Sequence, residues 1–304
     1  MQFVKCSIPV VVLLMSASIG LAQQTPLSAG FVLGGSNYLG EIGGKYEPRA
    51  SLLDADIIST SPTFGAFLRY AANDRVRISG EVNYVHIRQA DHNAEDPARQ
   101  ARNLNFRNRM VEFGFRTDFT VFHISDRSNN RNFARPGKLS VRGFVFTGAY
   151  GVLHNPQAQI THDPNNEWED RWYDLRPLRT EGQVEEYASL IAAVPVGLGI
   201  EFGLGYGWIL GFEGSWRSTF TDYLDDISGM YANPDYLSPL AEAISSQANE
   251  ATIAAINNPA SGNVNNHQYN EGGTFRGNPE TNDSYGTIQV TLARTIDTRT
   301  SFER

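Results

Sequence analysis

Apolar and polar side chains alternate along several long stretches of this chain, and this period of two restricts its fold more than any other feature. Successive side chains of a β-strand point to opposite faces, so the alternation is typical of strands with one apolar face. The pattern predicts eight strands, at 27–37, 63–72, 76–84, 111–121, 139–153, 188–202, 208–220 and 284–297. We therefore expect an all-β protein.

Two classes of protein share this pattern. In a soluble barrel or sandwich the bulky apolar face is the core, whereas in an outer-membrane barrel it faces lipid and the polar face lines the interior. Long strands, aromatic residues near strand ends, and an alternation of long and short connections favour the membrane. We expect an eight-stranded antiparallel transmembrane β-barrel with both termini in the periplasm and extracellular loops at about 38–62, 91–109, 154–185 and 222–283.

Charged residues recur on the polar faces of the predicted strands. An eight-stranded barrel is only wide enough for side chains to fill it, so charges that point inward must be paired. In the alternative soluble fold the same residues would form a solvated outer face. The predicted interior charges are Glu81, Glu112, Arg116, Asp118, Glu201, Glu213 and Arg217.

The first 22 residues have the pattern of a secretory signal peptide, with Lys5 before an apolar stretch and small residues at 20–22. Its removal leaves residues 23–304 as one barrel domain in the outer membrane, in contact with outer-membrane lipids. The single cysteine, Cys6, is lost with this segment, so no disulfide is expected. A formal net charge of -8 argues against nucleic acid as a partner.

One short helix is expected in the last extracellular loop. Ser238 and Pro239 provide an N-cap and a first-turn proline, an alanine-rich run follows over 240–256, and Pro259 ends it.

Candidates for chemistry are sparse. His123 and Ser125 resemble the His/Ser pair of outer-membrane lipid A deacylases, but a histidine and a serine at a turn explain them as well. Acidic groups that suit Ca²⁺, or that are simply solvated, are Asp222, Asp225 and Asp226 in one loop and Asp163, Glu167, Glu169 and Asp170 in another. We expect no catalytic residue, no cofactor, no bound metal and no small-molecule substrate.

Two basic groups suggest contacts. Arginine suits phosphate recognition, so lipopolysaccharide contact is an option for Arg99, Arg102, Arg107 and Arg109. The connection from 123 to 138 is long and basic for a periplasmic turn, and a periplasmic partner or plain solvent explains it equally well. Its basic residues are Arg127, Arg131, Arg135 and Lys138.

Five segments, taken in order, resemble the motifs of the PorG-like (DUF6089) outer-membrane barrels of Bacteroidetes. They span 34–41, 102–107, 175–183, 219–226 and 276–279. Their candidate loop-shaping or contact residues are Asn37, Tyr38, Gly40, Asn103, Phe106, Arg107, Pro177, Thr180, Glu181, Gly182, Asp222, Tyr223, Asp225 and Asp226.

The resemblance implies an accessory of the type IX secretion and gliding machinery that docks a periplasmic lipoprotein ring to the outer membrane and is not the translocation pore. Two alternatives stay open. One is a surface-loop binding protein or adhesin on the same barrel, and the other is a lipid A-modifying enzyme.

Overall fold

The computed structural model describes residues 27–43, 59–124, 140–161, 163, 165, 167–248, 253–254 and 272–296. Within these ranges no helix has the length and hydropathy needed to span a membrane. The predicted signal peptide and the basic connection with Arg127, Arg131, Arg135 and Lys138 lie outside the described residues.

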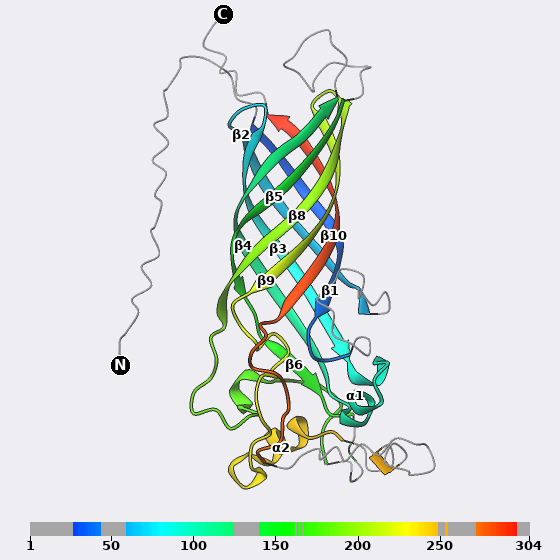
Figure 1. Cartoon of the computed structure of the whole chain (residues 1–304), viewed down its shortest axis with the longest axis vertical. Helices are drawn as coiled ribbons and strands as arrows, with labels where there is room; N and C mark the ends of the chain where they lie inside the picture. The colour runs from blue at the N-terminus through cyan, green and yellow to red at the C-terminus, as the bar shows by residue number, and fades with distance from the viewer. Residues whose placement is uncertain are drawn as a thin grey trace, which may run out of the picture.

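Eight long strands form the wall of a closed barrel (Figure 1). They are β1 (Leu27–Leu39), β2 (Ser61–Ala71), β3 (Val76–Ala90), β4 (Asn105–Ile124), β5 (Ser140–Leu153), β8 (Leu190–Gly205), β9 (Trp208–Thr219) and β10 (Ser284–Ile296). All neighbouring pairs are antiparallel, and β1 pairs with β10 in register Leu27 with Ile296. The prediction of an eight-stranded antiparallel barrel is confirmed.

The outer face of the wall is apolar and exposed. Phe31, Phe115 and Ile288 leave 73%, 71% and 72% of their surface uncovered, and most outward positions of the other strands are also large and apolar. A contiguous apolar surface of this size would be costly in water and is the lipid-facing band of a membrane barrel. The fold is therefore a transmembrane β-barrel of the outer-membrane type.

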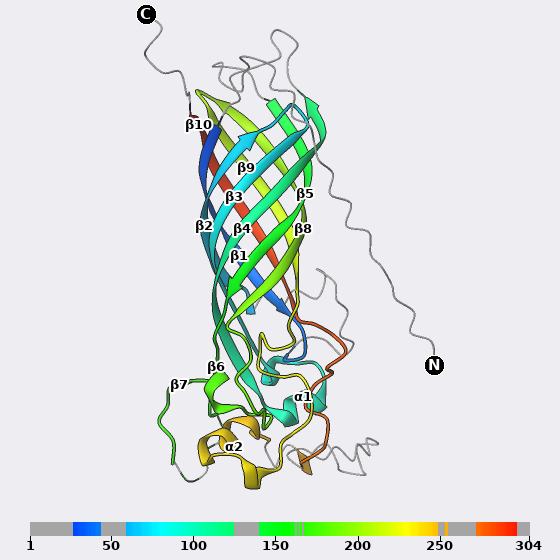
Figure 2. The ribbon, with the colours of Figure 1, turned by 90° about the vertical axis from the view of Figure 1, so that its left-hand side faces the viewer.

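The connections differ sharply between the two ends of the barrel (Figures 1 and 2). The short turns 72–75 and 206–207 lie at the end where β1 begins and β10 finishes. The connections 40–60, 91–104, 154–189 and 220–283 all lie at the opposite end. We call the described parts of these four connections, together with the strand ends they join, the loop cap.

The loop cap has its own secondary structure. Strands β6 (Pro156–Gln159) and β7 (Trp172–Asp174) extend the sheet from β4. Helices α1 (Pro97–Arg102) and α2 (Pro239–Ser245) accompany the short 3-10 turns η3 (Asp91–Asn93), η4 (Arg176–Leu178) and η5 (Pro234–Tyr236).

Three expectations about the loops need correction. Strand β4 begins at Asn105, so the second loop ends before the expected residue 109. The expected helix over 240–256 is interrupted: α2 ends at Ser245, where Ser246 leaves the helical backbone conformation with φ of -132° and ψ of 81°, and residues 253–254 are helical again. A second helix, α1, was not expected, although Asp96 caps it at the N-terminus through Ala98.

An apolar cluster joins the barrel to the loop cap. It combines inward residues at the cap end of the strands with residues of the loops, so the loops pack onto the barrel through a continuous core. Its members are Tyr38, Ile42, Val85, Ile87, Leu104, Phe106, Met110, Tyr150, Val152, Ala193, Leu224, Ile227 and Tyr285.

Candidate functional site: the barrel interior and the loop cap

Arg116, on β4, is the centre of the charged interior. Its Nε lies 2.9 Å from Asp118 and 3.1 Å from Glu81, and its Nη2 lies 2.8 Å from Glu213 on β9. Tyr150 donates its hydroxyl to Glu81 at 2.7 Å. One guanidinium group therefore ties three carboxylates from three strands together.

A second group of ion pairs surrounds Glu201 on β8. Arg69 Nη1 lies 2.5 Å and Arg77 Nη1 lies 2.8 Å from its carboxylate, and Arg142 Nη2 lies 3.4 Å away. Arg77 also reaches Asp118 at 3.2 Å, which links this group to Arg116.

Glu112 and Arg217 form the third group, nearest the loop cap. Arg217 Nε lies 3.0 Å from Glu112 Oε1, and Tyr285 donates its hydroxyl to the same oxygen. Arg217 also donates to Ser215 and Thr287, so this buried guanidinium has partners from β4, β9 and β10.

The interior charges balance. Five buried arginines on the strands (69, 77, 116, 142 and 217) face five buried carboxylates (81, 112, 118, 201 and 213). Buried charges are tolerated when they are paired in this way, and an eight-stranded barrel has no room for both these side chains and an open channel. The described interior is a packed plug.

All seven interior charges proposed from the sequence are buried in this network. The sequence interpretation omitted five further members, Arg69, Arg77, Arg142, Tyr150 and Tyr285. Each lies on the inward face of its strand, so the same alternation contained the signal that would have found them.

Tyr38 connects two aspartates at the base of the loop cap. Its hydroxyl lies 2.7 Å from Asp225 Oδ2 and 2.5 Å from Asp283 Oδ1, while the backbone N–H of Glu41 approaches the phenol oxygen at 3.2 Å. The carboxylate of Asp283 also accepts the N–H of Leu224 at 2.9 Å. Residues from the first and last loops thus meet at one phenol oxygen.

The geometry around Tyr38 requires a proton on one of its two aspartates. A phenol has a single O–H and can donate to one carboxylate only, so the second short contact needs a carboxyl that donates back to the phenol oxygen. Burial raises the pKa of Asp225 to about 8, and the nearby Glu41 adds to this shift. Burial also raises the pKa of Asp283 well above its usual range, and Asp225 adds to that shift.

Asp226 and Glu181 organise the outer part of the loop cap. Asp226 accepts the hydroxyls of Thr180 and of Tyr187, the latter at 2.8 Å, and lies 3.6 Å from Arg276 Nη2. Glu181 lies 3.2 Å from Arg276 Nη1 and accepts the N–H groups of Ser228 and Gly229. Burial raises the pKa of Asp226 to about 6, although Arg276 opposes the shift.

The other motif residues also shape the loops. Phe106 packs edge-on against Tyr38, Asn103 donates to Thr161, and Asn37 donates to Thr60. Pro177 lies in η4, Gly182 takes a left-handed backbone with φ of 71°, and Tyr223 stacks on Tyr187 with ring centroids 4.6 Å apart. Asp222 is buried beside this cluster, and burial raises its pKa to about 7.

Two arginines proposed as lipopolysaccharide contacts have partners within the loop cap. Arg102 binds Asp91 through Nε at 2.7 Å and donates to the backbone oxygens of Glu41 and Arg276. Arg99 donates to the backbone oxygen of Gly43. Arg102 is largely buried and Arg99 is half-buried, and the spacing of these arginines did not show these contacts.

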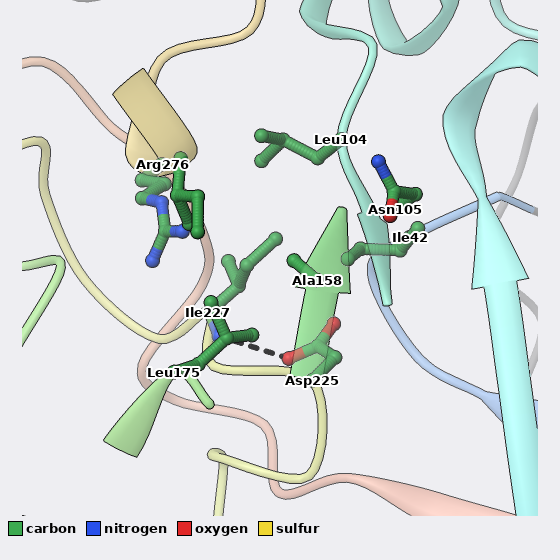
Figure 3. Close-up of a pocket in the computed structure, with 9 residues that line it drawn as sticks. Ile42, Leu104, Asn105, Ala158, Leu175, Asp225, Ile227 and Arg276 are labelled. Carbon is green, nitrogen blue, oxygen red and sulfur yellow. Dashed lines mark hydrogen bonds between the residues drawn. The ribbon is translucent and has the colours of Figure 1, made fainter. Parts of the chain in front are cut away.

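A small cavity lies inside the loop cap (Figure 3). Its volume of about 10 Å³ is at most enough for about one water molecule. Asp225 and Arg276 line it together with apolar residues, and the N–H of Ile227 donates to Asp225 Oδ1 at 3.0 Å.

The described side chains contain no group of three or more His, Cys, Asp or Glu arranged to hold a metal ion, and this includes the acidic residues considered for Ca²⁺. His123 lies at the end of β4, at the barrel end opposite the loop cap, and its proposed partner Ser125 is outside the described residues.

A family model described as a domain of unknown function (DUF6089) matches residues 5–241. The chain belongs to the DUF6089 family. The resemblance predicted from the five motif segments is thereby confirmed, and the match includes four of the five. No curated protein matches this DUF6089 chain.

Solved outer-membrane barrels are similar in outline to this DUF6089 protein. Neisserial surface protein A has 8% identity and a TM-score of 0.34, covering 90% of this chain and 98% of its own. The attachment invasion locus protein Ail of Yersinia pestis has 8% identity and a TM-score of 0.31, covering 89% and 96%. The N-terminal barrel of Pseudomonas aeruginosa OprF has 9% identity and a TM-score of 0.27, covering 89% and 98%.

Proposed function

We propose that this protein is an outer-membrane barrel component of the type IX protein secretion and gliding machinery, with a docking role and no catalytic one. The observation that carries the proposal is the plugged interior. A barrel filled by five paired arginines and five carboxylates has no room for an open channel, which favours a role in contact with other molecules. Membership of the DUF6089 family supports the secretion role through the resemblance described above.

In this proposal the end with the short turns faces the periplasm. Outer-membrane barrels have short periplasmic turns and long external loops, so the loop cap is on the cell exterior and both strand termini are periplasmic. Removal of residues 1–22 as a signal peptide is part of the same proposal.

The proposed contact with the periplasmic lipoprotein ring is the basic connection between β4 and β5. Its residues Arg127, Arg131, Arg135 and Lys138 are cationic in an otherwise acidic protein, which favours an acidic partner surface. Deleting 127–135 should reduce co-purification of the ring lipoprotein and export of type IX cargo while the barrel still folds.

A control deletion in the connection between β9 and β10, for example of residues 255–270, should leave ring co-purification unchanged. Equal co-purification by the 127–135 deletion and the intact chain, with a folded barrel on heat-modifiability gels, would show that docking occurs elsewhere.

A second candidate function is binding by the loop cap at the cell surface. Large side chains are exposed there, namely Val184 at 88%, Tyr236 at 83% and Phe275 at 74%. An adhesin predicts normal export of type IX cargo after gene deletion, whereas the secretion role predicts a loss of export. A lipid A-modifying enzyme instead predicts a lipid A mass change that disappears in His123→Ala.

A further inference from the structure

Three arginines face outward from the barrel wall where β3 and β4 enter the loop cap. Arg88 on β3 is directly opposite Arg107 on β4, and Arg109 is opposite His86 two positions closer to the membrane band. Arg88 and Arg109 are exposed and Arg107 is half-buried. We call Arg88, Arg107 and Arg109 the outer cationic cluster.

The cluster lies directly beyond the lipid-facing band. Along β3 the outward residues are Val82 and then Tyr84 before His86 and Arg88, while Val85 and Ile87 point inward. The apolar face thus changes from outside to inside between Tyr84 and Val85. This inversion marks where the outer wall leaves the acyl chains and enters the headgroup layer.

The same inversion occurs on β4. Phe113 and Val111 face lipid, and Arg109 and Arg107 follow outward while Met110 is buried. Two residues of a strand span about 7 Å, so Arg109 lies within about one headgroup of the last apolar residue.

No carboxylate of the described residues forms an ion pair with any of the three arginines. Arg107 donates its Nε to Gln157 at 2.8 Å and stacks on Trp172 at 4.2 Å, which leaves its terminal nitrogens without a hydrogen-bond partner in that part of the chain.

We propose that the outer cationic cluster binds the phosphate of a lipid headgroup in the leaflet next to the loop cap. Guanidinium groups bind phosphate through paired, charge-assisted hydrogen bonds, and three of them carry more than enough positive charge to neutralise a phosphate monoester of about -2. The lipid source follows from the position, because acyl chains of the same molecule would lie against Val82, Val111 and Phe113. This proposal does not depend on the secretion role.

The site differs from the one suggested by sequence spacing alone. Arg99 and Arg102 have partners within the loop cap, whereas Arg88 joins the cluster through strand pairing, 19 positions before Arg107.

Native mass spectrometry of the purified full-length barrel in detergent tests the proposal, with phosphatidic acid as the probe and phosphatidylcholine as the neutral lipid. The intact protein should retain phosphatidic acid at least about tenfold better than phosphatidylcholine. The triple variant Arg88→Gln, Arg107→Gln and Arg109→Gln should lose about tenfold or more of that affinity. A matched control, Arg75→Gln, Arg171→Gln and Arg179→Gln, removes the same charge from exposed sites elsewhere and should lose less than about twofold.

Heat-modifiability gels first establish that each variant is folded. If the triple variant does not fold, the single variants Arg88→Gln and Arg109→Gln replace it, and each should lose about threefold in affinity.

Equal losses in the cluster variant and the matched control would overturn the proposal, as would equal binding of both lipids. Displacement of the lipid by inorganic phosphate below about 1 mM would show a site for free phosphate and would overturn the lipid assignment. Export of type IX cargo is measured separately, so failure of either proposal is recognised on its own.

Discussion

The hydroxyl of Tyr38 lies 2.5 Å from the carboxylate of Asp283, although 245 positions separate the two residues in the sequence. Tyr38 is near the end of β1, and Asp283 directly precedes β10. Their hydrogen bond joins the first and last strands of the barrel at the base of the loop cap. Asp225, from the connection between β9 and β10, shares the same phenol.

Tyr38→Phe should loosen the loop cap and leave the barrel intact. The change leaves two buried aspartates without the hydroxyl that joins them, a loss of about 1–3 kcal/mol. Limited proteolysis should then cut the connection 220–283 faster, while heat modifiability stays as in the intact protein. Tyr236→Phe is the control, since Tyr236 also lies in the loop cap and is 83% exposed. Equal protease sensitivity of the two variants would contradict the assigned role of Tyr38.

The loop cap should be more stable at mildly acidic than at mildly basic pH. The pKa of Asp225 is raised to about 8, and burial raises the pKa of Glu41 to about 7. Between the unfolded value near 4 and these raised values, the folded cap binds more protons than the unfolded chain, so stability falls as the pH rises.

Hydrogen exchange, corrected for the intrinsic rate at each pH, measures this dependence. Protection of the segment 220–231 should fall at least about tenfold between pH 5.5 and pH 8.5, whereas the segment 111–119 of β4 should hold its protection. Asp225→Asn should flatten the profile, because an amide keeps the shape of the carboxyl group without titrating. A profile as steep in Asp225→Asn as in the intact chain would exclude Asp225 as the group responsible.

Arg116→Met should destabilise the whole barrel by about 3–5 kcal/mol, because Glu81, Asp118 and Glu213 would lose a shared buried partner. Urea unfolding in lipid, followed by heat modifiability, gives the change in midpoint. Arg294→Gln is the matched control, since Arg294 is exposed and stacks on Trp208 at the outside of the wall. Similar midpoints for the two variants would mean that the interior network adds little to stability.

Gly40→Ala should disturb the same cap junction from the backbone side. A Cβ at Gly40 would lie 2.0 Å from the Tyr38 hydroxyl and 2.6 Å from Asp283, so these groups must move apart. Gly80→Ala provides the comparison, because its Cβ would meet nothing closer than Phe115 at 3.5 Å. We expect faster proteolysis of the cap in Gly40→Ala only, and unchanged cleavage there would argue against a tight junction.

The barrel was predictable from the sequence because its determinants are local. Alternation gave all eight strands to within a few residues, apart from β3 and β4, which run six residues further into the cap than expected. In these last six residues of β3 and first six residues of β4, the apolar side chains point inward instead of outward. The sequence pattern of outward apolar residues therefore stops at Tyr84 and Val111.

The loop cap was not predictable in the same way. The contacts of Tyr38 with Asp225 and Asp283 join positions far apart in the sequence, and no periodicity reports which loops meet. Helix α1 did carry a local signal, the N-cap Asp96 followed by Pro97. Arg102 and Arg109 belong to the same arginine-rich stretch of the sequence. Only the fold shows that Arg102 forms a buried ion pair with Asp91, whereas Arg109 is exposed on the outer wall.

The position of Asp283 one residue before β10 couples the closure of the barrel wall to the attachment of the first loop. The strand that closes the barrel against β1 directly follows the carboxyl group that binds Tyr38. The same C-terminal segment therefore supplies both the last contact of the wall and a contact that holds the first loop. A polypeptide cut short before residue 283 would have neither, and would present an open sheet edge to the membrane.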